Sequence, residues 1–135
     1  MARVDVTVRG AGIFGLSIAW AGARRGARVR VIVPSGPGAG SSGGLVGALS
    51  PHVPEAWNAK KAFQLESLLL AESWWRAVEA ASGLEAGYAR TGLLRPLAEA
   101  RAGETASARA VEAVGLWQGQ ADWRLVAVPG APWEP

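Results

Sequence analysis

Residues 5–33 read DVTVRGAGIFGLSIAWAGARRGARVRVIV, and this stretch decides the fold. A β-branched run from Val4 to Arg9 predicts a strand, because such side chains fit a pleated surface. A turn with three glycines follows: Gly10, Gly12 and Gly15. The apolar segment after it, ending near Arg25, predicts a helix, and Arg28–Val33 predicts a second strand. The order strand, helix, strand is a β-α-β unit.

The spacing Gly-x-Gly-x-x-Gly has a physical reason at each position of such a unit. Gly10 permits the tight turn, Gly12 lets a pyrophosphate approach the backbone, and Gly15 lets the helix pack close to the strand. The free N–H groups at the positive end of the helix would then meet the phosphates. A glycine-rich turn that only packs is the alternative, but the strand-turn-helix context favours a dinucleotide site.

The pattern departs from a dinucleotide site in one place. An Asp or Glu usually ends the second strand and binds the adenosine ribose hydroxyls. This chain has Val33 there, followed by Pro34, and no acidic residue occurs between Val6 and Pro54.

Length and composition indicate one folded domain. The chain has 135 residues, of which 50% are hydrophobic and 19% charged. It has no cysteine, so disulfides, thiolate metal ligands and cysteine nucleophiles are excluded. The uncharged run from Gly10 to Ala23 suits a buried helix and is too short for a membrane span. We therefore expect no membrane span and a cytoplasmic location.

The charge is unevenly placed along the chain. Residues 1–54 hold six arginines and one acid, Asp5, whereas the remainder holds eight basic and ten acidic residues. A basic N-terminal part favours a polyanionic ligand, although a bias in arginine usage is a competing explanation. No basic run interleaved with aromatics and no helix-turn-helix pattern occurs, so we expect no nucleic-acid partner.

A second small-residue stretch lies at Pro34–Pro54, PSGPGAGSSGGLVGALSPHVP. Small residues let a backbone lie against a phosphate-bearing ligand, and the hydroxyls of Ser41 and Ser42 can donate to phosphate or ribityl oxygens. His52 is the only histidine, and a hydrogen-bonded loop histidine near a cofactor is favoured over a metal ligand.

The two glycine segments together resemble the N-terminal part of FAD-dependent oxidoreductases of the D-amino-acid oxidase and glycine oxidase type. The oxidase domain of a bifunctional tRNA-modifying enzyme is a similar relative. The resemblance implies a Rossmann-like α/β fold, FAD as cofactor and an amine or amino acid as substrate. It covers about the first 95 residues and is vague afterwards.

The resemblance also implies which residues bind FAD. In that family the glycine turn holds the pyrophosphate, the end of the second strand meets the ribose, and the glycine/serine loop runs towards the flavin. The corresponding positions here are Gly10, Gly12, Ile13, Phe14, Gly15, Val33, Pro34, Ser41, Ser42, Gly43, Gly44, Leu45, Val46, Gly47, Ala48 and Leu49. No residue is assigned a catalytic or metal-binding role.

The remainder of the chain predicts two helices and two strands. Residues 58–82 predict a helix with Asn58 as N-cap and Gly83 as C-cap, and residues 99–116 predict an alanine-rich helix. Strands are predicted at 90–97 and 123–128. In relatives of the resembled family the first of these strands approaches the substrate, which makes Arg90 and Arg95 candidate contacts.

The predicted nucleotide-binding sheet is incomplete, because the chain offers no further β-α-β unit for a third strand. We expect residues 1–135 to be an N-terminal FAD-binding segment without the substrate domain, truncated or split from it. An open strand edge favours pairing with another chain, a second copy or a different subunit. Two alternatives stay open: an NAD(P)-binding Rossmann module, and a non-catalytic interaction domain that binds no cofactor.

Overall fold

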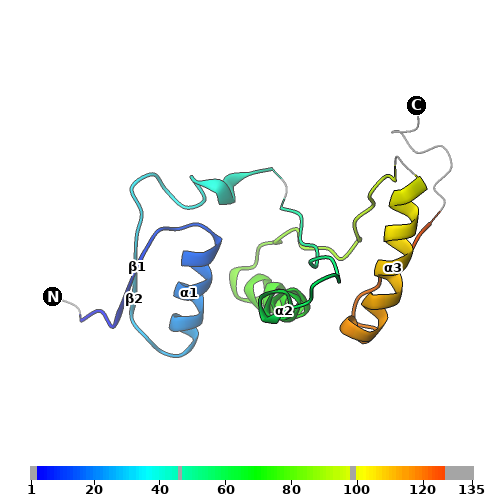
Figure 1. Ribbon diagram of the computed structural model, residues 1–135. Helices are drawn as coiled ribbons and strands as arrows, with labels where there is room; N and C mark the ends of the chain where they lie inside the picture. Colours follow the sequence, from blue (N-terminus) through cyan, green and yellow to red (C-terminus); the bar gives the residue numbers. More distant parts are fainter. Residues whose placement is uncertain (1–2, 46, 98–99, 127–135) are drawn as a thin grey trace. The chain divides into compact units, whose positions relative to one another are not determined.

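The computed structural model describes residues 3–45, 47–97 and 100–126, with only the backbone at Ala100 (Figure 1). The chain divides into two compact units, residues 1–48 and 49–135. In the described part of the chain, no helix is both long and apolar enough to cross a membrane.

The first unit is the predicted β-α-β unit. Strand β1 (Val6–Arg9) leads into helix α1 (Ile13–Arg24), and strand β2 (Val29–Ile32) follows. The two strands are parallel, with Val6 opposite Val29 and Arg9 opposite Ile32, and α1 contacts both (Figure 1). The α/β fold predicted from the sequence is confirmed. Each strand is two residues shorter than expected, and the helix begins within the glycine turn, at Ile13.

Helix α1 packs on the strands through two glycines. A Cβ built on Gly15 would lie 2.2 Å from the carbonyl oxygen of Gly10 and 3.4 Å from Cγ1 of Val8. A Cβ built on Gly22 would lie 3.2 Å from Cγ2 of Val29. Val8 and Val29 therefore face the helix, and Val8 is buried.

The opposite face of the sheet carries three polar side chains and one apolar side chain. Because side chains alternate along a strand, Thr7 and Arg9 of β1 and Arg30 and Ile32 of β2 point away from α1. All four are exposed. Parallel sheets are normally covered on both faces, and two strands alone are marginally stable. Within the described residues the predicted incomplete sheet is confirmed.

An ion pair joins the starts of the two strands. The Asp5 carboxylate accepts hydrogen bonds from Nε and Nη2 of Arg28, both at 3.0 Å, and from the Arg28 backbone N–H at 2.9 Å. These bonds hold the pKa of Asp5 below its usual value and raise that of Arg28. The one acid of the first unit is thus neutralised at the end of the sheet away from the glycine turn.

The second unit contains two long helices, each close to its predicted bounds. Helix α2 (Ala59–Ser82) begins where Asn58 Oδ1 accepts from the N–H groups of Lys60 and Lys61, at 3.0 and 3.2 Å. It ends at Gly83, whose φ of 70° is left-handed. Helix α3 (Ala100–Trp117) follows. Leu65 packs with Ala113 and Trp117 in the buried core of this unit.

A polar cluster ties the loop before α2 to α3. The Glu55 carboxylate accepts a hydrogen bond from Nε of Arg109, whose guanidinium lies 5.3 Å from the centroid of the Trp123 ring. Lys61 Nζ donates to the carbonyls of Val53 and Glu55. The hydrogen bond from Arg109 lowers the pKa of Glu55.

The two predicted C-terminal strands are wrong where the structure describes them. Residues 90–97 and 123–126 form neither helix nor strand, and 127–128 lie outside the described residues. Both segments are rich in apolar residues, but no strand pairs with them in the described ranges. Arg90 instead donates through Nη2 to the Gln120 carbonyl at 2.9 Å, which links this segment to the end of α3.

The contact at Gly15 leads to a first prediction. Gly15→Ala is expected to lower the free energy of unfolding by about 1–3 kcal/mol, because backbone atoms must move to admit the methyl group. Urea denaturation followed by circular dichroism measures this change. The control is Gly103→Ala on α3, where a Cβ meets no atom within 4 Å. Equal losses in the two variants would contradict the prediction.

The Glu55–Arg109 pair leads to a prediction on pH. Since the folded-state pKa of Glu55 is lowered, its contribution to stability is present above the usual titration range of glutamate. It is lost as the pH falls through the folded-state pKa. Glu55→Gln should therefore lower the urea midpoint at pH 7, and its difference from wild type should shrink as the pH falls through the folded-state pKa of Glu55. The control is Glu66→Gln on the exposed surface of α2, which should leave the urea midpoint at pH 7 unchanged.

Candidate functional site

The glycine turn between β1 and α1 has the shape that the sequence predicts. Gly10 adopts a φ of 108°, which only glycine takes readily, and its N–H donates to the Ile32 carbonyl at 2.9 Å. The first strand thereby stays bonded to the second up to the turn. Gly12 then precedes α1 as its N-cap, and no side chain caps the helix from that position.

The second glycine segment lies directly against this turn. The Gly38 N–H donates to the Ala11 carbonyl at 2.8 Å, and the hydroxyl of Ser42 accepts from the Ile13 N–H at 2.9 Å. A Cβ built on Gly12 would lie 3.0 Å from Ser42 Oγ. The two motifs that the sequence places about 30 residues apart therefore form one surface.

The loop that carries Ser42 is tightly folded. It contains a short 3₁₀ helix, η1 (Ser41–Gly43), in which the Gly43 N–H donates to the Gly40 carbonyl at 3.0 Å. A Cβ on Gly43 would lie 2.3 Å from the carbonyl oxygen of Gly38. The loop can close in this way only with glycine at position 43.

Sequence reasoning missed two members of this site, Ala11 and Gly38. Ala11 contributes only its carbonyl, for which no side-chain signal exists. Gly38 carried a signal, because it forms a Gly-x-Gly pair with Gly36 and both have left-handed φ values of 73° and 94°. That pair marks the point where the loop turns back towards α1.

The electrostatics of the turn favour an anion. The N–H groups of Phe14 and Gly15 in the first turn of α1 have no backbone or side-chain acceptor among the described residues. They lie at the positive end of the helix dipole. No acid lies in the first turn, and none occurs from Val6 to Pro54.

The other predicted site residues are exposed or lie outside the described residues. Phe14 is 85% exposed, and Ser41, Gly44, Gly47 and Ala48 are exposed as well. Leu45 is fully exposed. Val46 lies outside the described residues, and Leu49 begins the second unit, where it is exposed. The structure thus brings the glycine turn together with residues 36–44.

Val33 follows β2 directly, next to the residue that bonds Gly10, and it is half-buried; Pro34 is exposed. This is the point at which a dinucleotide-binding unit has its ribose-binding carboxylate. A valine side chain accepts no hydrogen bond, so the departure seen in the sequence remains in the folded unit.

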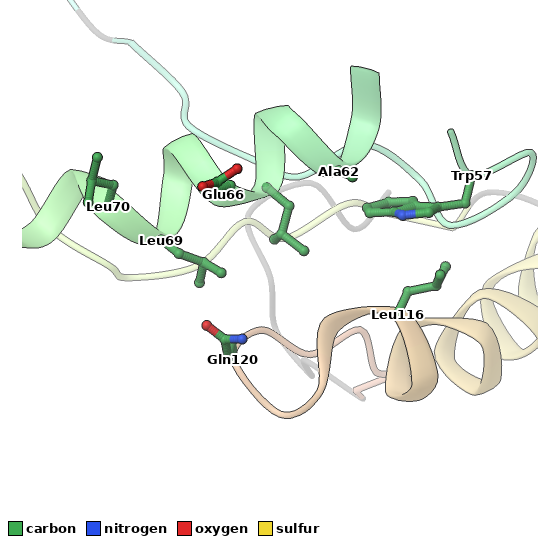
Figure 2. A pocket seen from close by; sticks show the side chains of 8 residues that line it. Trp57, Ala62, Glu66, Leu69, Leu70, Leu116 and Gln120 are labelled. Atoms are coloured by element: carbon green, nitrogen blue, oxygen red, sulfur yellow. The ribbon is translucent and has the colours of Figure 1, made fainter. Parts of the chain in front are cut away.

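The second unit contains an apolar groove of about 480 Å³ between α2 and α3 (Figure 2). Six apolar side chains line it with Glu66 and Gln120: Trp57, Ala62, Leu65, Leu69, Leu70 and Leu116. His52 is exposed, and its backbone N–H donates to Gln64 Oε1 at 3.0 Å. No group of three metal-ligating residues occurs among those described. Glu66 is the one ionisable residue among those that line the groove, so the groove offers no pair of groups for acid–base chemistry.

The β-α-β unit and its two bonded glycine segments define a protein of the dinucleotide-binding class. Comparison with known proteins gives the family: the model for FAD dependent oxidoreductases matches residues 5–128. The chain belongs to this family, which is FAD-dependent. No solved structure matches it.

A curated relative is the tRNA 5-methylaminomethyl-2-thiouridine biosynthesis bifunctional protein MnmC of Chromohalobacter salexigens. The chain is 39% identical to it over 74 residues, which cover 55% of this chain and 11% of the relative. The match thus spans a small part of the relative's length.

The bond between the two glycine segments leads to a prediction. Ser42→Ala removes the acceptor of the Ile13 N–H and should lower stability by about 0.5–1.5 kcal/mol. It should also speed hydrogen exchange at the Ile13 amide, which NMR measures directly. Ser41→Ala is the matched control, because no hydrogen bond of the Ser41 side chain occurs among the described residues. Unchanged exchange at Ile13 in Ser42→Ala would contradict this contact.

Proposed function

We propose that this chain forms the FAD-binding part of an oxidoreductase that oxidises an amine or an amino acid. The observation that carries the proposal is the hydrogen-bonded pair of glycine segments. It joins the positive end of α1, the Cβ-free Gly12 and the hydroxyl of Ser42 in one surface. These are the groups that a pyrophosphate needs: amide donors, close backbone approach and a neighbouring hydroxyl.

In this proposal each part of the surface has a role. The amides of Phe14 and Gly15 bind phosphate oxygens, and the hydroxyls of Ser41 and Ser42 donate to phosphate or ribityl oxygens. The loop 43–49 continues along the cofactor towards its flavin end. Bound FAD supplies a ring that accepts a hydride from substrate.

The substrate class rests on the family and on one relative. The name of that relative refers to synthesis of a methylaminomethyl nucleoside, which contains an amine. No residue of this chain is proposed to be catalytic. The substrate-binding groups are proposed to come from further polypeptide, either continuous with this segment or in a second subunit.

The open sheet supports the same proposal. Val6, Val31 and Ile32 are 39%, 37% and 45% exposed, so the two strands leave apolar surface uncovered within the described residues. A further strand from the remaining polypeptide, from a second subunit or from a second copy would pair with a free edge and cover it.

Val33 is the observation that favours a second candidate function. Loss of hydrogen bonds to a charged acceptor costs about 1.5–3 kcal/mol, or roughly one to two decades of affinity. FAD binding is therefore expected to be weakened by Val33 and not abolished. Val33 supports two alternatives: an NAD(P)-binding module, and an interaction domain that binds no cofactor.

A titration with FAD tests the proposal. Purified chain should take up FAD, with flavin absorption between about 300 and 500 nm that co-elutes with protein on gel filtration. Gly12→Ala places a methyl group 3.0 Å from Ser42 Oγ, against the hydroxyl that this proposal assigns to a phosphate oxygen, and should weaken FAD binding about tenfold or more.

Gly103→Ala serves as the control, because it makes the same change on α3, which belongs to the other compact unit. It should bind FAD as wild type does. A chain that takes up no FAD would overturn the proposal, and equal affinity in Gly12→Ala would overturn the placement of the pyrophosphate.

A further inference from the structure

The outer edge of β1 has no partner strand within the described residues. β1 pairs with β2 on one side only. The N–H groups of Val6 and Gly10 donate to carbonyls on the β2 side. Because backbone groups alternate along a strand, those of Thr7 and Arg9 point to the other side. A row of unpaired donors and acceptors of this kind can pair with one more strand.

The side chains along this edge carry opposite charges at the two ends of the strand. Asp5 directly precedes β1, and Arg9 ends it. Asp5, Thr7 and Arg9 alternate with the residues that face α1, so all three lie on the face of the sheet away from the helix. All three are exposed, and no carboxylate of the described residues forms an ion pair with Arg9.

A strand with this order of charges is complementary to itself when a second copy runs antiparallel to it. With Thr7 opposite Thr7 of the other copy, each Asp5 lies opposite an Arg9. Opposite charges directly across an antiparallel pair are stabilising. Moving the centre of the pair to Val6 or Val8 separates these charges, and moving it to Arg9 places two arginines opposite each other. The charges therefore select one register.

The outer edge of β2 lacks this complementarity. Arg28 precedes β2 and Arg30 lies within it, and β2 contains no acid. Antiparallel pairing of β2 with its own copy places arginines opposite each other or leaves Arg30 opposite Ile32. Like charges directly opposite each other are destabilising. Charge complementarity therefore favours the β1 edge.

We propose that two copies of this chain pair through β1 in antiparallel orientation, with Thr7 at the two-fold axis and Asp5 of each copy opposite Arg9 of the other. The product is a four-stranded sheet in the order β2-β1-β1-β2. The two-fold axis is perpendicular to the sheet and keeps both α1 helices on one face. Two strands alone are marginally stable, and pairing supplies the further strands that each copy lacks.

Sedimentation equilibrium of the full chain tests the proposal. Wild type should form a reversible dimer of twice the 14.0 kDa of the chain. Its dissociation constant should be micromolar, because short strands bury little surface. The dissociation constant should rise several-fold between about 0.05 and 0.5 M salt, since the contacts between Asp5 and Arg9 are exposed and screened.

Reversing one charge of the edge gives the first variant. Arg9→Asp places carboxylates opposite each other at both ends of the pair and should raise the dissociation constant about tenfold or more at low salt. Added salt should then lower it, because repulsion is screened. Arg30→Asp is the matched control: it makes the same charge change on the same face, but on β2, and should leave the dissociation constant largely unchanged.

A cysteine at the centre of the pair reports the register, since the chain has no cysteine of its own. Opposite residues of a hydrogen-bonded antiparallel pair have Cα atoms about 5.5 Å apart, a distance that a disulfide can span. Mild oxidation of Thr7→Cys should therefore give a covalent dimer on a non-reducing gel. In the control Arg30→Cys the two positions are three strand spacings apart, about 14 Å, and should stay unlinked.

Each result decides the proposal. A wild type that stays monomeric at about 0.1 mM overturns it, and the edge is then available to a strand of another polypeptide. A dimer that Arg9→Asp does not weaken, or that Thr7→Cys does not cross-link, forms through another surface and overturns it as well. None of these outcomes depends on FAD, so the pairing through β1 and the proposed function can fail separately.

Discussion

The structure of the first unit depends on one close approach, between α1 and the end of β1. Gly15 sits so near the Gly10 carbonyl that a methyl group does not fit, and Val8 packs against the same point. This contact sets the position of the helix N-terminus relative to the strand. The proposed role of the turn in binding a pyrophosphate depends on this position, because the amides of the first helical turn lie beside the end of the sheet.

The loop of residues 36–44 then depends on the turn. Its bonds to Ala11 and Ile13 use a carbonyl and an amide that the turn leaves available. A serine hydroxyl both accepts a bond and has a proton to donate, so Ser42 can bond to the helix and still serve a phosphate. The site is thus built mainly from backbone groups, and glycine is needed wherever two backbones meet.

The family is FAD-dependent, but this unit lacks the acidic residue that usually ends the second strand of a dinucleotide site. The one acid of the first unit stabilises the start of the strands, where Arg28 neutralises it. At the opposite end of the strands, Arg9 pairs with Ile32, and Val33 follows Ile32. One face of the sheet and its apolar strand edges are exposed. The elements that normally cover a parallel sheet are not among the described residues.

The sequence by itself determined the β-α-β unit, both glycine segments, the helix bounded by Asn58 and Gly83, and the missing ribose carboxylate. These are local properties, which periodicity, capping residues and glycine spacing indicate. Only the tertiary structure decided that Ser42 bonds to Ile13, that Gly38 bonds to Ala11, and that residues 90–97 form no strand. Contacts between distant backbone groups leave no mark on side-chain patterns, and a strand requires a partner as well as a suitable composition.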